Sequence, residues 1–205
     1  MSEAIKLNKS QKQILLTVAK ETIRATIDEE DIPEFDFEDE IFNEQRGAFV
    51  TIHKSGNLRG CIGYIQGIKP MIDTIKDMSL SAAFKDPRFP ALRKEEFDDL
   101  NIEISILTPL TTVSDIEEIE VGEHGLIIKQ GFRQGLLLPQ VAVDNNWDRE
   151  EFLRHTCMKT GLPTDAWQDS STEIKKFSAQ IFDADVGEIL DIDEARNKFS
   201  SQMRE

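Results

Sequence analysis

Seven residues near the middle of the chain alternate between two kinds of side chain. Isoleucine occupies every second position of Asn101–Leu107, and Glu103 and Ser105 stand between the isoleucines. Because successive side chains of a β-strand point to opposite faces, this spacing predicts a strand with one apolar face. We expect the isoleucine face to pack in a core, with Glu103 and Ser105 on the other face.

Two further strands precede this one along the chain. The segments Gly47–His53 and Leu58–Ile65 are rich in residues that favour strands. They are separated by Lys54-Ser55-Gly56-Asn57, a composition typical of tight turns. The sequence therefore predicts a β-hairpin.

Three segments carry apolar residues at helical spacing. Ser10 is placed to cap the first, which reaches Ile27. Pro70 stands at the start of the second, and two prolines soon after residue 86 end it. Asp148 and Glu151 form a capping-box pattern before the third. Cys157 lies in the apolar stripe of that third helix, so we expect it in a core.

The last third of the chain adds short strands at 126–129, 136–138 and 174–182, and then an acidic, polar tail. Strands and helices do not alternate regularly, which favours an α+β fold with a mainly antiparallel sheet over a doubly wound one. We expect a smaller α+β subdomain at 114–171, inserted in a larger subdomain of 1–113 and 172–205 that holds both termini. A cleft between the two would be a natural place for a ligand.

Acidic residues greatly outnumber basic ones. The 205 residues include 24 Lys+Arg and 39 Asp+Glu, a formal net charge of −15. Nine of the acids lie in the thirteen residues Asp28–Glu40, which we expect to be a solvated loop. This charge disfavours binding of nucleic acid through its phosphates and binding to an anionic membrane surface.

The sequence shows no pattern typical of a metal or cofactor site. Cys61 and Cys157 form no Cys-x-x-Cys, and the three histidines have no metal-ligand spacing. No dinucleotide- or phosphate-binding glycine motif is present. No signal-peptide pattern appears, and no apolar run approaches the ~18 residues of a membrane span. We therefore expect no metal, no cofactor, no membrane association, and a cytoplasmic protein with reduced thiols.

The segment Leu58–Gly63 is the strongest candidate for chemistry. On a strand, Arg59, Cys61 and Gly63 would share a face, and the guanidinium would favour the thiolate form of Cys61. Gly60 and Gly63 would leave the thiol open to a ligand. The alternative is a small cysteine packed where space is tight.

A second candidate is the segment Asp86-Pro87-Arg88-Phe89. Pro87 stiffens this loop, so the guanidinium of Arg88 would be held in place to bind a carboxylate or phosphate. The alternative is an internal salt bridge to Asp86 or Glu103. Both interpretations stay open at this stage.

Four polar residues elsewhere would serve the same site if the fold brings them to it. Glu103 would act as a base or anchor an arginine, and Ser105 shares its face; the alternative is a solvated face. His124, between glycines, would be a base for Cys61 or a structural residue. Gln140, after the strand 136–138, would orient a ligand or cap a helix.

Six motifs of the chain occur together and in the order of a known family. They are Gly47-Ala48-Phe49-Val50, Leu58–Gly63, Asp86–Phe89, Ile102–Ser105, Gly122 with His124-Gly125-Leu126, and Gly135–Ala142. In these the chain resembles the AMMECR domain family, also called AmmeMemoRadiSam system protein A. The resemblance covers about Ile14 to Phe182.

The resemblance implies a larger α+β subdomain with a smaller one inserted, and a cleft faced by the motif of Cys61. It implies a role involving nucleic acid, and, from the second family name, association with Memo-like and radical S-adenosylmethionine proteins in a modification pathway. It assigns no role to any residue.

Three functions are compatible with these observations. The first is a cleft enzyme, or enzyme component, that uses Cys61 on a protein, nucleic-acid or metabolite substrate, with His124 or Glu103 as base. Its substrate would be bound by Arg59, Gly60, Gly63, Asp86, Arg88, Ser105 and Gln140. The second is a non-catalytic binding module that presents the cleft to a partner protein. The third is nucleic-acid binding through Arg59, Arg88 and Arg133, against which the net charge weighs.

Overall fold

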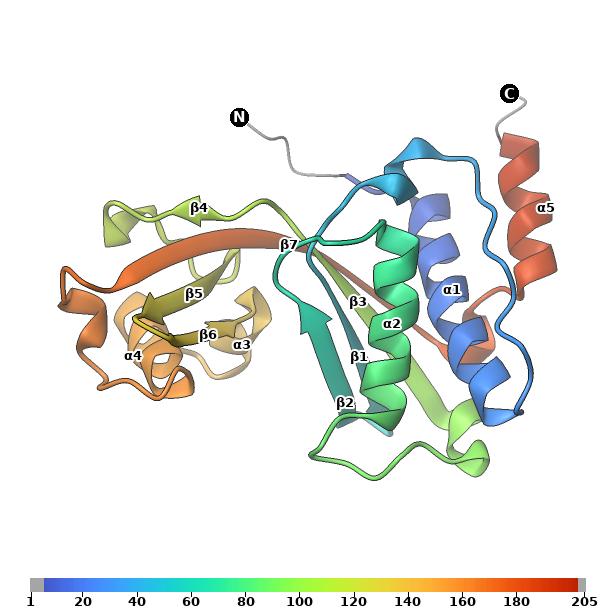
Figure 1. The fold of residues 1–205 in the computed structure, drawn as a ribbon, viewed down its shortest axis with the longest axis horizontal. Helices are drawn as coiled ribbons and strands as arrows, with labels where there is room; N and C mark the ends of the chain where they lie inside the picture. Colours follow the sequence, from blue (N-terminus) through green and yellow to red (C-terminus); the bar gives the residue numbers. More distant parts are fainter. Residues whose placement is uncertain (1–5, 203–205) are drawn as a thin grey trace. The chain divides into compact units, whose positions relative to one another are not determined.

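The computed structural model describes residues 6–202 (Figure 1). The fold is mixed α/β, with antiparallel strand pairs and helices, as the sequence predicts. It divides into two compact units. Among the described residues, the middle unit is Leu107–Ala179, and the terminal unit comprises residues 6–106 and 180–202. The cleft and the exact subdomain boundaries stay predictions.

The sheet of the terminal unit is built on the predicted hairpin. Strands β1 (Ala48–Lys54) and β2 (Asn57–Tyr64) are antiparallel, and β3 (Leu100–Leu107) pairs with the other edge of β1. The order is β2-β1-β3, followed by the long strand β7 (Glu173–Asp185). The hairpin and the strand at 101–107 are confirmed.

Two helices cover one face of this sheet, α1 (Lys9–Ile27) and α2 (Met71–Phe84) (Figure 1). Beneath them lie the isoleucines of β3, each at most 2% exposed, so the predicted buried face is confirmed. The contact between β2 and α2 is very close. A Cβ atom on Gly60 would lie 2.1 Å from the carbonyl oxygen of Ala82, so only glycine fits there.

Both ends of the terminal unit differ from the sequence prediction. Asn8, and not Ser10, caps α1, because its side chain accepts from the N–H of Gln11 while the Gln11 side chain accepts from the N–H of Asn8. The expected polar tail contains a helix, α5 (Ile192–Gln202), which lies beside α1 (Figure 1). Lys20 of α1 donates to Asp191, just before α5, at 2.8 Å.

The terminal unit also has three 3₁₀ turns, η1 (Glu40–Asn43), η2 (Lys94–Asp99) and η5 (Val186–Glu188). The acidic segment before η1 is not only a solvated loop. Its rings Phe35 and Phe37 are partly buried against the core.

The middle unit has its own sheet and core. Strand β5 (His124–Gln130) pairs with β6 (Arg133–Leu137) and with β7, which also pairs with β4 (Thr111–Thr112). Its helices are η3 (Ile116–Glu118), α3 (Pro139–Asp144), α4 (Arg149–Lys159) and η4 (Ala166–Gln168).

The third predicted helix, α4, begins as the sequence indicates. Asp148 and Glu151 form the capping box, and Cys157 is fully buried in the core of the middle unit. No helix within residues 6–202 is both long enough and apolar enough to cross a bilayer.

Candidate functional site

The face of the sheet opposite α2 carries the residues singled out from the sequence. The strand register aligns Cys61 of β2, Thr51 of β1 and Glu103 of β3 in one row. The next row holds Gly63, Phe49 and Ser105. Side chains opposite one another on paired strands lie about 5 Å apart, so the structure brings Cys61 and Glu103 to either side of Thr51.

This face is largely covered and not solvated. Ser105 is fully buried, Thr51 is 6% exposed, and Cys61 and Glu103 are half-buried. The hydroxyl of Ser105 has no hydrogen-bond partner among residues 6–202. The solvated alternative for this face is therefore wrong for Ser105.

Arg88 and Asp86 form a two-pronged ion pair beside Cys61. The guanidinium donates through Nε to Oδ1 of Asp86 at 2.9 Å and through Nη2 to Oδ2 at 2.6 Å. Nη2 also donates to the carbonyl oxygen of Cys61 at 3.1 Å, and the guanidinium lies 5.5 Å from the ring centre of Phe89. The internal salt bridge to Asp86 is thus confirmed, and it holds the guanidinium rigidly.

Asp86 joins this loop to strand β2. Its Oδ2 accepts the backbone N–H of Cys61 at 2.9 Å, and its Oδ1 accepts the backbone N–H of Arg88 at 3.1 Å. These bonds, chiefly those from the Arg88 side chain, hold the pKa of Asp86 far below its usual value. The Asp86 side chain is 1% exposed, whereas that of Arg88 is 50% exposed. The pair is therefore a buried carboxylate that fixes a half-exposed guanidinium.

The thiol of Cys61 is in its neutral form. Burial is the main influence and raises its pKa, and Glu103 and Asp86 act in the same direction. The hydroxyl of Thr51, which donates to Sγ at 3.3 Å, and the charge of Arg88 lower the pKa by less. An arginine does favour the thiolate, as predicted, but it is Arg88, and burial outweighs its effect.

The guanidinium of Arg59 binds Glu96 and is not among the main influences on the pKa of Cys61, in contrast to the prediction. It donates through Nε and Nη2 to the two carboxylate oxygens of Glu96, each at 3.1 Å, and through Nη1 to the carbonyl oxygen of Pro90 at 2.9 Å. The reason is a β-bulge: Leu58 pairs with His53 and Gly60 pairs with Ile52, so Arg59 is an extra residue in β2. A bulge redirects side chains, and here Arg59 joins β2 to η2.

The two glycines beside Cys61 serve packing, which corrects their predicted role as an open space for a ligand. Gly60 faces α2 and not the face of the thiol. Gly63 does share that face, but a Cβ atom there would lie 2.3 Å from the ring of Phe49. The ring fills the space above Gly63.

His124 and Gln140 belong to the middle unit, so their roles toward Cys61 stay predictions. Nδ1 of His124 accepts the backbone N–H of Glu120 at 3.0 Å, which fits the structural alternative. Burial, together with the charge of Lys176, lowers the pKa of His124, so the ring is neutral. Gln140 lies in the first turn of α3.

Sequence reasoning missed two residues of this region, Thr51 and Glu96. The alternation of β1 places Thr51 opposite to Val50 and Ile52, but the bulge decides that its partner is Cys61. Glu96 lies 37 residues from Arg59, and no local pattern connects them. Within residues 6–202, no three His, Cys, Asp or Glu side chains are grouped so as to hold a metal ion.

Comparisons with known proteins agree with the motif order. A family model described as AMMECR1 matches residues 16–182. A protein from Methanothermobacter thermautotrophicus is 49% identical over 152 residues, which are 71% of this chain and 79% of the relative. One from Methanococcoides burtonii is 42% identical over 206 aligned residues, 95% of this chain and 98% of the relative.

A solved structure has the same fold. The crystal structure of an uncharacterized protein from Pyrococcus horikoshii is similar with a TM-score of 0.80 at 35% identity. The match covers 86% of this chain and 92% of that one. The match to the family model over most of the chain, with these relatives, shows that the chain belongs to the AMMECR1 family.

Proposed function

We propose that the chain is a binding protein whose Arg88 holds an anionic group of its ligand, a carboxylate or a phosphate, beside the Cys61 thiol. The observation that carries this proposal is a guanidinium that is fixed by a buried carboxylate yet half-exposed. Nε and Nη2 are engaged, and no residue within 6–202 accepts a hydrogen bond from Nη1. A fixed guanidinium with a free nitrogen suits an oxyanion.

The neutral thiol supports binding over nucleophilic chemistry. A thiolate at Cys61 would repel an anion held by Arg88, whereas a thiol with a raised pKa does not. Asp86 offsets much of the guanidinium charge, so we expect a simple anion to bind weakly, with a Kd of roughly 1–10 mM. A larger ligand would add contacts along the same face.

The proposal is tested by titrating ¹⁵N-labelled protein with phosphate and with acetate while following amide resonances. Saturable shifts are expected at the amides of Cys61 and Arg88 with at least one of the two anions. Arg88→Met is expected to weaken binding at least roughly tenfold. Arg154→Met is the matched control, because Arg154 is 53% exposed and also pairs with a carboxylate, that of Glu150.

Two results would contradict the proposal. One is the absence of saturable shifts near Cys61 and Arg88 with either anion. The other is equal weakening by Arg88→Met and Arg154→Met, which would show only a general effect of surface charge.

The alignment of Cys61, Thr51 and Glu103 favours a second candidate, an enzyme that uses the thiol. Once a ligand is bound, the Thr51 hydroxyl would turn to accept the proton of the thiol and give its own proton to Glu103. Under this function Cys61→Ala abolishes activity in a complementation assay, and under the binding function the same variant complements. Full complementation by Cys61→Ala would rule out the enzyme function.

The partners implied by the resemblance belong to the same proposal. We expect the anionic group to be carried by a protein of the modification pathway, with Memo-like and radical S-adenosylmethionine proteins as the first candidates, in the cytoplasm. Co-purification of such a protein with the unmodified chain, and its loss with Arg88→Met, is the expected result. Binding that is insensitive to Arg88→Met would place the partner elsewhere on the chain.

A further inference from the structure

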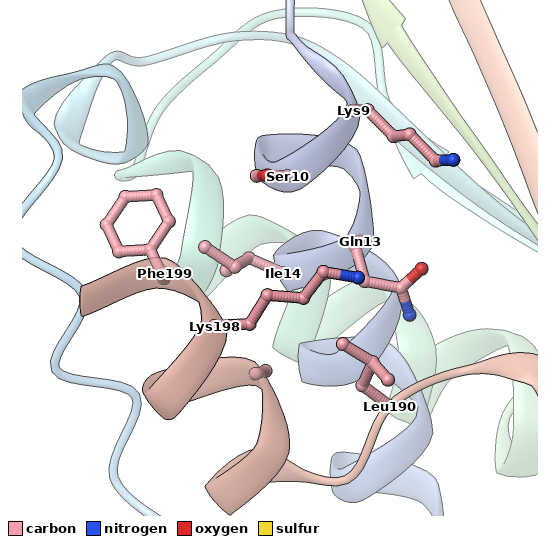
Figure 2. A pocket seen from close by; sticks show the side chains of 8 residues that line it. Lys9, Ser10, Gln13, Ile14, Leu190, Lys198 and Phe199 are labelled. Carbon is pink, nitrogen blue, oxygen red and sulfur yellow. The ribbon is translucent and has the colours of Figure 1, made fainter. Parts of the chain in front are cut away.

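The terminal unit contains a pocket that shares no residue with the Cys61 site. It is a cavity of about 200 Å³ between α1 and α5 (Figure 2). It is smaller than the roughly 300–1,000 Å³ of sites for drug-sized ligands, so its occupant is a small molecule.

One end of this pocket is apolar. Ile14 of α1 and Ala195 of α5 are nearly fully buried, and Phe199 is half-buried. The ring of Phe199 is held in place by edge contacts, with its centre 6.1 Å from that of Phe37. This end is thus a pre-formed apolar surface, which suits an aliphatic or aromatic group.

The other end is polar and basic. Figure 2 shows the side chain of Lys198 extending from α5 toward the amide of Gln13, and Lys9 stands above them on α1. Nε2 of Gln13 is buried and has no hydrogen-bond partner among residues 6–202. A buried donor without an acceptor is costly, so an acceptor bound at this nitrogen would be stabilised. Lys198 brings a positive charge to this side of the pocket, in a chain whose net charge is −15.

We propose that this pocket binds a small monocarboxylate with an apolar body. The carboxylate would accept from Gln13 and pair with Lys198, and the apolar body would lie against Ile14 and Phe199. Its two oxygens offer acceptors for both groups at once. A phosphate fits less well, because a compact, strongly hydrated dianion would leave the apolar end uncovered.

The test is isothermal titration of the full chain with octanoate and, separately, with the neutral analogue octanamide. Octanoate is expected to bind one to one, and octanamide at least roughly tenfold more weakly. In a parallel NMR titration, the side-chain amide of Gln13 and the ring of Phe199 are expected to shift together.

Three variants locate the ligand. Lys198→Met is expected to weaken octanoate binding roughly tenfold, and Lys129→Met, which removes an exposed lysine of the middle unit, to leave it unchanged. Ala195→Leu fills the apolar end and is expected to abolish binding. Since Lys198 is exposed, its variant is expected to fold even where Ala195→Leu does not.

The proposal is overturned if octanamide binds as tightly as octanoate, or if Lys198→Met and Lys129→Met bind octanoate equally. It is also overturned if octanoate does not saturate the protein. None of these outcomes bears on Arg88, so failure here is separate from failure of the proposed function.

Discussion

Two arginines near Cys61 form similar ion pairs that lead to different results. Arg59 and Arg88 each donate hydrogen bonds to both oxygens of a buried carboxylate. The Arg59 side chain is 12% exposed and its guanidinium also binds Pro90, whereas the Arg88 side chain is 50% exposed. The Arg59–Glu96 pair links β2 to η2 in a buried contact, and the Arg88–Asp86 pair holds a positive charge at the surface.

The difference shows that the groups around a guanidinium, and not its distance in sequence from Cys61, decide whether it can bind a ligand. Arg59 is two residues from the thiol and is not among the main influences on the pKa of Cys61. Arg88 is 27 residues away and contacts the backbone of Cys61. The surface pair is therefore the one available to a ligand.

The largest expected effect is on stability. Arg88→Met leaves Asp86, whose side chain is 1% exposed, without its cationic partner, so we expect a loss of about 3 kcal/mol. Arg59→Met is expected to lose about 1–2 kcal/mol, because Glu96 keeps a second cation, Lys54, at 3.4 Å. Urea unfolding of the two variants measures the difference, and equal losses would break the comparison.

A smaller effect is expected on acid stability. Arg59, the main influence, lowers the pKa of Glu96 from its usual 4.5 to about 2. A carboxyl whose pKa is lower in the folded state stabilises the protein above its unfolded pKa. This stability, roughly 2–3 kcal/mol, is lost as the pH falls from about 4.5 to 2.

Glu96→Gln should therefore flatten the dependence of unfolding free energy on pH in that window. In this variant the protonation of Asp86 still destabilises the protein at low pH, because the pKa of Asp86 is also lowered. A Glu96→Gln variant with the full pH dependence of the unmodified chain would contradict the assignment.

The smallest expected effect is on the reactivity of the thiol. The raised pKa predicts that iodoacetamide alkylates Cys61 more slowly at pH 8 than it alkylates a free cysteine. Arg88→Met should slow the reaction by a further factor of about two to three, and Arg59→Met should not. Peptide mass spectrometry reads Cys61 separately from the buried Cys157. Equal rates in both variants would remove the distinction between the two arginines.

Local patterns in the sequence were sufficient for much of the fold. The isoleucine face of β3, the hairpin and the capping box of α4 each depend on residues within a few positions of one another, so they could be predicted. Helix α5 could not be, because few of its positions are apolar and its place depends on α1, as the contact of Lys20 with Asp191 shows.

The candidate site was predictable in its members but not in their pairing. Cys61, Asp86 and Arg88 do meet, and their bonds join residues 25 and 27 positions apart, which no local pattern encodes. The partner of Arg59 could not be found, since a single extra residue in β2 changes where the side chain points. Burial then reversed the expected effect on the thiol.

The bulge at Arg59 sets which residues of β2 share a face with Cys61. Arg59 is one residue more than the pairing between the turn and Cys61 needs. This extra residue shifts the pairing by one, so the later residues of β2 lie on the opposite faces from those that a regular strand would give them. If Arg59 instead paired with Ile52 and the bulge were lost, Gly60 would lie opposite Thr51 and Cys61 opposite Val50, on the face that the helices bury. The bulge thus places Cys61 on the same face as Thr51 and Glu103, and a deletion of Arg59 would remove the Arg59–Glu96 pair while leaving Cys61 opposite Thr51.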